Sequence, residues 1–536
     1  MLLFLQTSAS AMELYSLSDL QLIAPEIILT VCACVVLVME VVLPYRKSKL
    51  TGYFALAGIG LAIISVLTLF HSISGTYLPW RTEGTLPDVY GFYQMVRIDG
   101  FAIIFKLIFL LAAGLSIAIS MRFLDIEGEQ HGEYYALVLF ATVGMMFLGS
   151  GYDLIALFIS LELMALTFYI LVAFTKRQKR SNEAAMKYFL LGAFSSGILL
   201  YGMSLLYGVA GSTNLGDIAS AVSAALHSPD ATAVAATLPL RPLLLLGMIA
   251  MAAGLFFKIA AVPFHMWAPD AYEGAPTSVT AFLSTGSKAA SFALFARIFM
   301  EALGGMRADW APLLGLVAAV TIMVGNWGAV TQENSKRLLA YSSISNGGYL
   351  LLGLIAANEY GYIGLVIYLF VYTLMNLGAF GIIISLRRRG IIGDNVDDLT
   401  GLAQKSPWMA IMMTVFMLSL GGLPVTGGFI GKYFLFGGLL QRGTEEGKSW
   451  YYWLAVWAIL NTVVSFYYYV RFIRVMYLSD RVADERPLTF SPALRTALVI
   501  SLIGVIFIGV YPQPFIDIAQ KLLKPLTDVV GAVAFR

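Results

Sequence analysis

The chain has 536 residues, of which 59% are hydrophobic and 12% are charged. Soluble domains carry roughly 25% charged residues, so this composition excludes a water-soluble globule and favours a protein whose apolar surface faces lipid. The formal net charge of +2 gives no indication of a nucleic-acid partner, and the information lies in where the charges are placed.

Fourteen apolar segments have the length and composition of membrane-spanning helices. Such a helix needs about 20 mostly apolar residues, and it satisfies its own backbone polar groups, which lipid cannot do. The sequence therefore predicts an all-α membrane protein with about 14 transmembrane helices. In chain order we expect them near residues 20–43, 52–71, 98–121, 133–150, 153–175, 183–209, 241–262, 275–302, 308–331, 336–356, 359–386, 406–440, 450–477 and 491–511.

Two of these segments contain helix-breaking residues. The segment at 406–440 includes Gly421-Gly422-Leu423-Pro424, and the segment at 241–262 runs into Pro263. They are the seventh and the twelfth helices, and inverted repeats with broken helices at matching positions are typical of transporters. We therefore expect four regions: helices 1–3 in residues 1–132, two inverted five-helix repeats in 133–302 and 303–477, and helix 14 with the C-terminal tail in 478–536.

Basic residues are distributed unevenly between the two ends of the predicted helices. The loops opposite the N-terminus hold nineteen Lys and Arg residues, and those on the N-terminal side hold nine. Because cytoplasmic loops carry the excess of basic residues, both termini are expected outside the cytoplasm. The residues up to Met12 lack a charged leader and a clear cleavage site, so the first apolar segment is expected to remain as an uncleaved insertion signal.

Five ionisable side chains fall deep inside predicted helices. They are Glu162, Lys187, Lys258, Lys288 and Lys432. Apart from Lys258, which lies just before the Pro263 break, they lie roughly 10–18 Å along their helices by the 1.5 Å rise per residue. Each such group costs roughly 2.5–3.5 kcal/mol at a helix centre, so we expect all five to face a polar interior.

These residue types in this setting point to proton transfer. Burial disfavours the charged form of an amine, so a buried lysine can release a proton near neutral pH, and a nearby carboxylate restores its charge. Glu162 is the only deep carboxylate among the four lysines, so some amines are expected to be neutral at rest. Hydroxyl groups could link them: Ser160, Ser195, Ser196, Ser284, Thr285, Ser287, Tyr341, Ser342, Ser343 and Ser345.

Other polar residues have a structural alternative. His265, two residues after Pro263, could pass protons from the cytoplasm to Lys258 or could be a loop histidine at the interface. Lys106 is expected to form a static ion pair near Asp99, and Arg297 to reach water from a helix end. Cys32 and Cys34, two residues apart on a helix, point to different faces, and two such thiols cannot build a zinc or iron–sulfur site.

Several long runs of sequence surround the deep charges: 160–164, 183–189, 258–277, 284–288, 336–344 and 422–432. Together they resemble the antiporter-like membrane subunits of respiratory complex I, the proton-pumping NADH:quinone oxidoreductase. The Glu-Ala-Ala-Met-Lys-Tyr-Phe run that begins at Glu183, together with the lysine at position 432, is most similar to the branch called subunit N.

The resemblance implies a role for each deep charge. Glu162 and Lys258 would form a gating pair, Lys187 and Lys288 would be relays, and Lys432 would be the exit-side lysine. It also implies a place beside the other membrane-arm subunits in a bacterial plasma membrane. No cofactor or metal is expected in this chain, because NADH, FMN, the iron–sulfur clusters and quinone would bind to other subunits.

One position departs from the family pattern. Many relatives carry His where this chain has Asn346, and an amide does not titrate in the working pH range. The link from Lys288 towards Lys432 must then depend on water or hydroxyl groups. Two other readings stay open at this point: a subunit of a multisubunit sodium/proton antiporter, which would share the fold, and a purely structural membrane scaffold.

Overall fold

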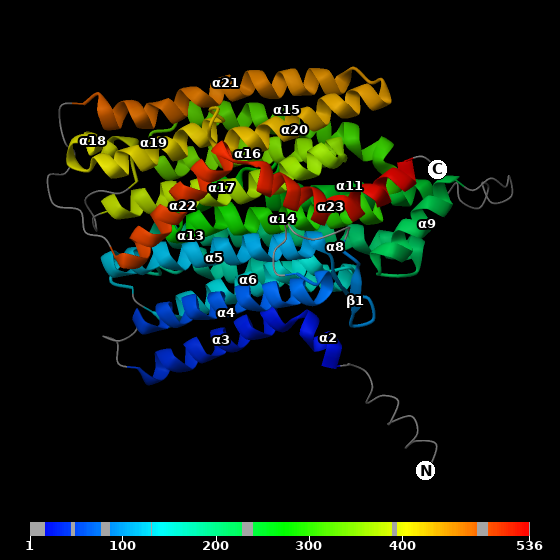
Figure 1. Cartoon of the computed structure of the whole chain (residues 1–536), viewed down its shortest axis with the longest axis horizontal. Helices are drawn as coiled ribbons and strands as arrows, with labels where there is room; N and C mark the ends of the chain where they lie inside the picture. Colours follow the sequence, from blue (N-terminus) through cyan, green and yellow to red (C-terminus); the bar gives the residue numbers. More distant parts are fainter. Residues whose placement is uncertain are drawn as a thin grey trace, which may run out of the picture.

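The computed structural model describes residues 17–43, 49–76, 86–129, 131–227, 240–387, 394–479 and 491–534. Long helices run side by side through the whole molecule (Figure 1). Within these residues, twelve helices are long and apolar enough to cross a membrane. They are α3 (Ala24–Val42), α4 (Lys49–Ser74), α5 (Gly100–Glu127), α6 (Gly132–Ser150), α7 (Leu154–Val172), α8 (Lys179–Ala210), α11 (Leu240–Ile259), α15 (Arg307–Val330), α16 (Ser335–Ala356), α17 (Glu359–Leu386), α21 (Trp450–Tyr477) and α22 (Pro492–Val510).

The two remaining predicted spans are helices of irregular form. The eighth runs from α13 (Thr277–Phe282) through a π-helical turn (Leu283–Ser287) and α14 (Lys288–Ala296) into a second π-helical turn (Arg297–Ala302). The twelfth consists of α19 (Pro407–Gly421) and α20 (Gly427–Glu446). All fourteen predicted segments are thus helical, which confirms the expected fold class.

Both predicted helix breaks are present. Helix α11 ends at Ile259, Ala260 has a positive φ of 58°, and the chain turns before α12 (Trp267–Gly274). Helix α19 ends in Gly422, whose φ of +83° is a left-handed conformation that glycine adopts without a Cβ clash. Prolines 263 and 424, which follow these ends, have no N–H with which to continue a helix.

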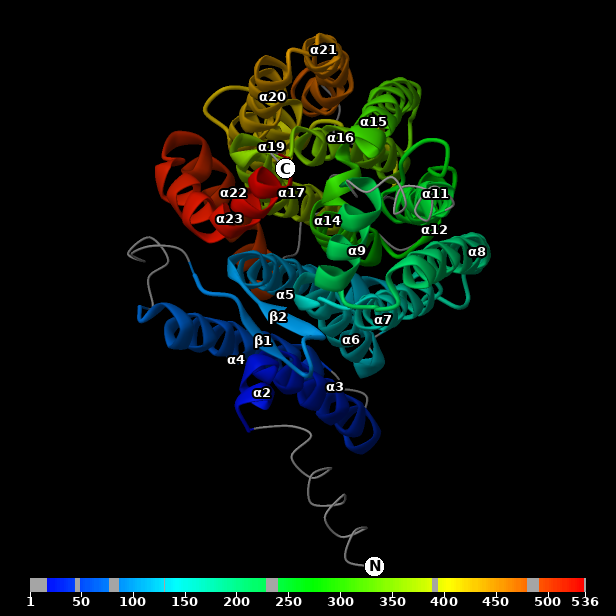
Figure 2. The ribbon, with the colours of Figure 1, turned by 90° about the vertical axis from the view of Figure 1, so that its right-hand side faces the viewer.

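Helix packing follows a matching order in the two halves of the chain. Helix α6 packs along α7 and α8 packs along α11; in the second half, α15 packs along α16 and α17 along α20. Viewed end-on, α3 and α4 lie at one edge of the bundle and α21 at the opposite edge (Figure 2). Of the most apolar stretches of α16 and α17, 94% of the residues are buried, so these helices form its centre.

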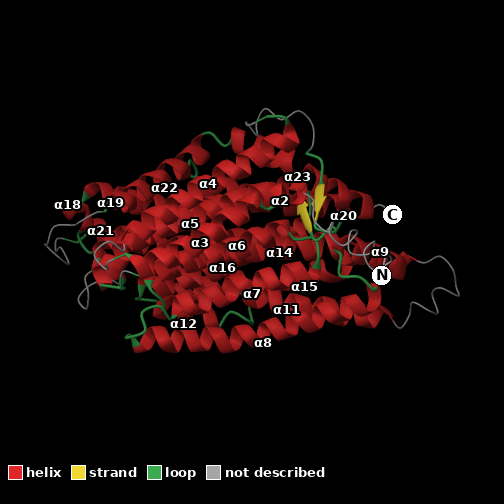
Figure 3. Ribbon diagram, turned by 90° about the horizontal axis from the view of Figure 1, so that it is seen from below, coloured by secondary structure: helices red, strands yellow, loops and turns green. Residues whose placement is uncertain are grey.

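The two ends of the bundle differ. One end carries the hairpin of β1 (Val89–Gly91) and β2 (Val96–Ile98) and helix α9 (Leu215–His227), and the other carries α12 and α18 (Leu402–Lys405) (Figure 3). The short helix α2 (Leu17–Leu22) precedes α3, and 3₁₀ turns occupy Gly304–Met306 and Val396–Leu399. Residues up to Met12, on which the insertion-signal prediction depends, and residues 228–239 lie outside the described residues.

The C-terminal helix α23 (Gln513–Ala534) follows α22 and packs on α17 and on the start of α5. Gly100, the first residue of α5, lets its backbone approach, because a Cβ at this position would lie 2.1 Å from the carbonyl oxygen of Leu522. This helix thereby covers one end of the central helices.

Candidate functional site

Three of the predicted lysines lie in the centre of the bundle. Lys258 is 7% exposed, and Lys288 and Lys432 are each 3% exposed. In the part of the chain that the structure describes, no carboxylate oxygen lies within 4 Å of any of the three amino groups. The charge of each amine is therefore not fixed by an ion pair.

Lys258 lies at the end of α11, directly before the seventh-helix break. Its amino group is buried and has no protein hydrogen-bond partner among the described residues, and it lies 6.0 Å from the centre of the Phe257 ring. The carboxylate whose charge acts on it is Glu162 of α7. Among the described residues, one carboxylate oxygen of Glu162 is also buried without a hydrogen bond. The charge of Glu162 therefore acts on Lys258 although no ion pair joins the two groups.

Lys288 begins α14, where the π-helical turn ends. Its amino group donates to the carbonyl oxygen of Ser343 in α16, and it lies 6.0 Å from the centre of the Tyr372 ring. A Cβ at Gly347 would lie 3.4 Å from this amine and 3.1 Å from the carbonyl oxygen of Ile259. The absent side chain of Gly347 therefore brings the Lys258 end of α11 close to Lys288.

Lys432 of α20 binds the interrupted end of α19. Its amino group donates to the carbonyl oxygens of Leu420, at 2.9 Å, and Gly421, at 3.5 Å. Carbonyl groups at a helix C-terminus have no intrahelical partner and carry partial negative charge, so they stabilise an ammonium group. The ring centre of Tyr349 lies 4.8 Å from the amine. The helix break thus creates the binding site of the lysine.

A first polar cluster lies on the Lys288 side. The hydroxyl of Tyr368 donates to the amide oxygen of Asn346 at 2.6 Å, and the amide nitrogen of Asn346 donates to the carbonyl oxygen of Ser342 at 2.9 Å. The Ser342 hydroxyl lies 2.5 Å from the hydroxyl of Tyr469 in α21. The position that carries Asn346 is therefore surrounded by hydroxyl groups.

A second polar cluster lies on the Lys432 side. The hydroxyl of Tyr468 donates to Asn326 of α15 at 3.0 Å, and the amide of Asn326 lies 3.5 Å from the hydroxyl of Tyr349. Thr462 donates to the same Tyr349 hydroxyl at 3.2 Å. The ring centres of Tyr468 and Tyr469 are 4.4 Å apart, so the two clusters meet at this pair of residues.

Of the hydroxyl residues expected from the sequence, Ser342 joins these clusters. Ser284 and Thr285 instead donate to carbonyl oxygens of their own helix. The tyrosines of the two clusters, which are Tyr349, Tyr368, Tyr468 and Tyr469, were not predicted from the sequence. A usable signal was present, because a phenol in a membrane segment needs a hydrogen-bond partner.

The expectation that Lys187 is deeply buried is wrong. Its side chain is 45% exposed and forms ion pairs with Glu183 at 2.8 Å and with Asp270 of α12 at 2.9 Å. The 1.5 Å rise along α8 gives the depth of a residue but not the face on which it lies, and this turn of α8 faces outwards.

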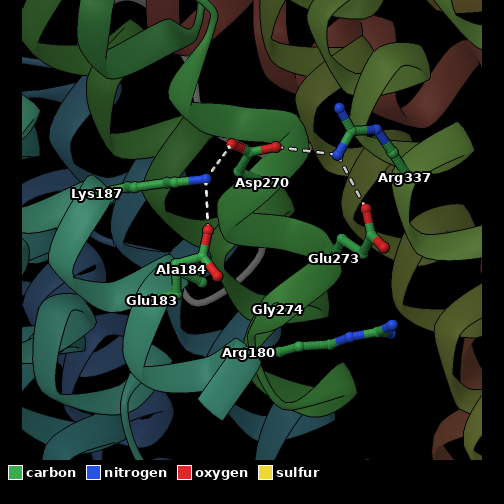
Figure 4. A pocket seen from close by; sticks show the side chains of 8 residues that line it. All are labelled: Arg180, Glu183, Ala184, Lys187, Asp270, Glu273, Gly274 and Arg337. Atoms are coloured by element: carbon green, nitrogen blue, oxygen red, sulfur yellow. Dashed lines mark hydrogen bonds and ion pairs between the residues drawn. The ribbon is translucent and has the colours of Figure 1, made fainter.

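Lys187 belongs to a charged pocket of about 230 Å³ between α8, α12 and α16 (Figure 4). Arg337 joins Asp270, at 3.0 Å, to Glu273, at 2.9 Å, and Arg180 also lines the pocket. The pocket lies at the α12 end of the bundle, which is the end that carries most of the basic loop residues. Lysine, arginine and carboxylate groups thus alternate along the wall of this pocket.

His265 lies in the seventh-helix break, five residues before Asp270. It is half-buried, and its Nδ1 atom has no protein hydrogen-bond partner among the described residues. Within the same ranges no hydrogen bond or ion pair joins it to Lys258. The structure therefore brings the histidine to the break between the pocket and Lys258, without direct contact to that lysine.

Lys106 forms an ion pair, as expected. Its amino group lies 2.7 Å from a carboxylate oxygen of Glu26 in α3, and both side chains are buried. Arg297 does not reach water. It is fully buried and donates to Asp99, to Glu301 and to the carbonyl oxygen of Gly149. A π-helical turn at Arg297 directs the side chain inwards, into this charge cluster.

The same cluster sets the protonation of Asp99, which caps the N-terminus of α5. Burial alone would raise the pKa of this carboxyl, but the guanidinium groups of Arg297 and Arg97 hold the pKa well below its usual value. Asp394, at the opposite end, behaves alike: burial raises its pKa, and Lys336 and Arg387 lower it further than burial raises it. Both charge clusters are therefore static ion pairs at the bundle ends.

Comparison with known proteins agrees with this geometry. Residues 151–460 match the family model described as NADH:quinone oxidoreductase/Mrp antiporter, TM. The chain is 46% identical over 512 residues to NADH-quinone oxidoreductase subunit N 2 of Solibacter usitatus, covering 95% of this chain and 98% of that protein. It is 47% identical over 525 residues to subunit N 1 of Koribacter versatilis, covering 97% and 98%.

Solved structures give the same fold. A chain of respiratory complex I from Thermus thermophilus, determined with bound aureothin, matches with a TM-score of 0.71 at 31% identity, covering 91% of this chain and 97% of that one. A chain of the Mrp complex from Dietzia sp. matches with a TM-score of 0.74 at 21% identity, covering 96% and 99%. The second match is a likeness of fold alone.

Proposed function

Because this chain belongs to the NADH:quinone oxidoreductase/Mrp antiporter membrane family, we propose that it is the N subunit of a bacterial NADH:quinone oxidoreductase and that it translocates protons. The near-full-length identity of 46–47% to proteins of that name favours this function over the sodium/proton antiporter alternative. The Mrp likeness does not discriminate, since the fold is common to both. The observation that carries the proposal is the set of three buried amines that have no carboxylate partner in the described part of the chain.

The redox chemistry takes place elsewhere in such a complex. NADH, FMN, the iron–sulfur clusters and quinone bind to other subunits, and this chain assembles with neighbouring antiporter-like and small membrane subunits. Among the described residues no three His, Cys, Asp or Glu side chains form a group suited to a metal ion. The contribution of this chain is the protein path along which protons move.

Proton uptake begins at the basic end. The pocket around Lys187 and Asp270 collects protons from the cytoplasm, and His265 in the helix break passes them towards Lys258. A charge change at the edge of the subunit reaches Glu162, and its separation from Lys258 makes the lysine release its proton. Lys288 receives it across Gly347, and the two polar clusters connect Lys288 to Lys432.

The remaining architecture fits this function. We assign residues 133–302 and 303–477 to two inverted repeats, which the matching helix pairs α6–α7 with α8–α11 and α15–α16 with α17–α20 support. The excess of basic residues at the α12 end favours a cytoplasmic location for that end, with both termini on the other side of the plasma membrane.

The proposal predicts the behaviour of two single variants of the assembled complex. Lys258→Ala and Glu162→Ala should both lower NADH-driven proton translocation and the coupled oxidase rate, because the gating pair is lost. Blue native electrophoresis should show normal assembly. Lys448→Ala is the matched control, since its side chain is 54% exposed and its amine pairs with Glu446, which is not one of the path residues. Wild-type turnover and pumping in both variants would falsify the proposal.

A further inference from the structure

Asn346 interrupts a proton path made of side chains. Its amide oxygen accepts from Tyr368 and its amide nitrogen donates to Ser342, so acceptance and donation occur on different atoms. An amide cannot pass on the proton that it accepts, whereas a hydroxyl is donor and acceptor at one oxygen. Asn326, which accepts from Tyr468 and faces Tyr349, interrupts the second cluster in the same way.

One hydroxyl lies beside the Asn346 interruption, on a residue that packs against the second cluster. The phenol oxygen of Tyr469 is 2.5 Å from the Ser342 hydroxyl and 3.4 Å from the Asn346 amide nitrogen. Its side chain is only 1% exposed, and its ring centre lies 4.4 Å from that of Tyr468, whose hydroxyl donates to Asn326 in the second cluster. Tyr349 in turn lies against the amine of Lys432.

We infer that the Tyr469 hydroxyl is the proton relay that bypasses Asn346 and joins the Lys288 half of the path to the Lys432 half. This inference rests on the proposed function and adds a residue to it. The phenol oxygen accepts a proton from the Ser342 side as its own proton leaves towards Tyr349. Tyr469 is neutral before and after, so no buried phenolate remains.

The test uses the complete complex in proteoliposomes and three variants. Tyr469→Phe should slow NADH-driven proton translocation about tenfold or more, the scale on which a positioned proton-transfer group acts. Tyr134→Phe is the matched control: this phenol is equally buried and donates to Ser278 at 2.8 Å, outside the path. Tyr469→Phe removes two buried hydrogen bonds and Tyr134→Phe removes one, so both variants should have a lower melting temperature, and only Tyr469→Phe should slow translocation.

Restoring proton translocation with a second substitution distinguishes a proton-relay role of Tyr469 from a packing role. In Tyr469→Phe, a second change of Asn346→His should restore translocation, because an imidazole accepts and donates protons near neutral pH. Absence of rescue in an assembled complex would overturn the inference. Should Tyr469→Phe not assemble, Ser342→Ala takes its place, since it removes the hydroxyl partner and keeps the phenol; wild-type translocation in that variant would also overturn it.

Failure of the inference is distinguishable from failure of the proposed function. If Lys258→Ala slows translocation and Tyr469→Phe does not, Tyr469 is not the relay and the subunit still pumps. If neither variant slows it, the proposed function itself is wrong.

Discussion

Within the described ranges, Lys288 and Lys432 are bonded to backbone carbonyl oxygens and Lys258 has no protein hydrogen-bond partner, whereas Lys106 and Arg297 are paired with carboxylates. Lys288 donates to Ser343 and Lys432 to Leu420. A carbonyl dipole is a fixed and weak partner, so the amine can gain or lose its proton. Lys106, by contrast, is paired with a carboxylate, and removing one member of such a pair leaves an uncompensated buried charge.

Gly347 offers a test of the contact between the two lysine sites. A methyl group at position 347 would lie 3.1 Å from the Ile259 carbonyl oxygen and 3.4 Å from the Lys288 amine. The first of these distances is shorter than an ordinary van der Waals contact. We expect Gly347→Ala to cost about 1–3 kcal/mol of stability by overpacking and to slow proton translocation. Gly60→Ala, where no atom lies within 4 Å, should change neither quantity, and equal translocation in both variants would contradict the prediction.

For single residues, the sequence predicts the type of a charged side chain and its depth along the helix better than it predicts the neighbouring side chains. Lys258, Lys288 and Lys432 could be found because each interrupts a long apolar run. The outward face of Lys187 could not, since its partner Asp270 lies 83 residues further along the chain. The tyrosine clusters were missed because they depend on which helices meet, and no spacing within one helix contains that information.

Among the helices, the two breaks were predictable because their causes are local. Glycine and proline at 421–424 and proline at 263 favour the end of a helix through the properties of their own backbone. The π-helical turns in the eighth helix were not predicted, since one extra residue in a turn has no distinct composition. Their effect is to turn Lys288 and Arg297 towards the interior.

The break in the twelfth helix leads to a prediction that compares two glycines, Gly422 and Gly447. Gly422 and Gly447 both end helices with positive φ, at 83° and 64°, so alanine strains the backbone at each by about 1 kcal/mol. A Cβ at Gly422 would also lie 3.1 Å from the Lys432 side chain, whereas one at Gly447 meets nothing within 4 Å. Both variants should melt earlier in detergent, and only Gly422→Ala should slow proton translocation.

For the whole molecule, the order of helices is encoded along the chain and their mutual placement is not. The fourteen segments and the uneven basic residues are local properties of the sequence. The packing of α8 on α11 and of α17 on α20, and the position of α23 over Gly100, depend on side-chain fit between distant segments. Such fit follows from the folded shapes of two surfaces and from no single stretch of residues.

The orientation can be checked by thiol labelling in a background without Cys32 and Cys34. Arg177→Cys lies in an exposed loop at the basic end, and Lys448→Cys lies at the opposite end. A reagent that cannot cross the membrane should label Lys448→Cys in intact spheroplasts and Arg177→Cys only after permeabilisation. The reverse labelling pattern would mean that the predicted orientation is wrong and that both termini lie in the cytoplasm.

Helix α19 ends inside the bundle, and its last carbonyl groups carry partial negative charge. The amine of Lys432 is hydrogen-bonded to these carbonyl groups. Sliding or tilting α19 by a fraction of an ångström alters the local field at the nitrogen. A displacement of α19 by a neighbouring subunit would thereby change the proton affinity of Lys432 through the carbonyl groups that bind its amine.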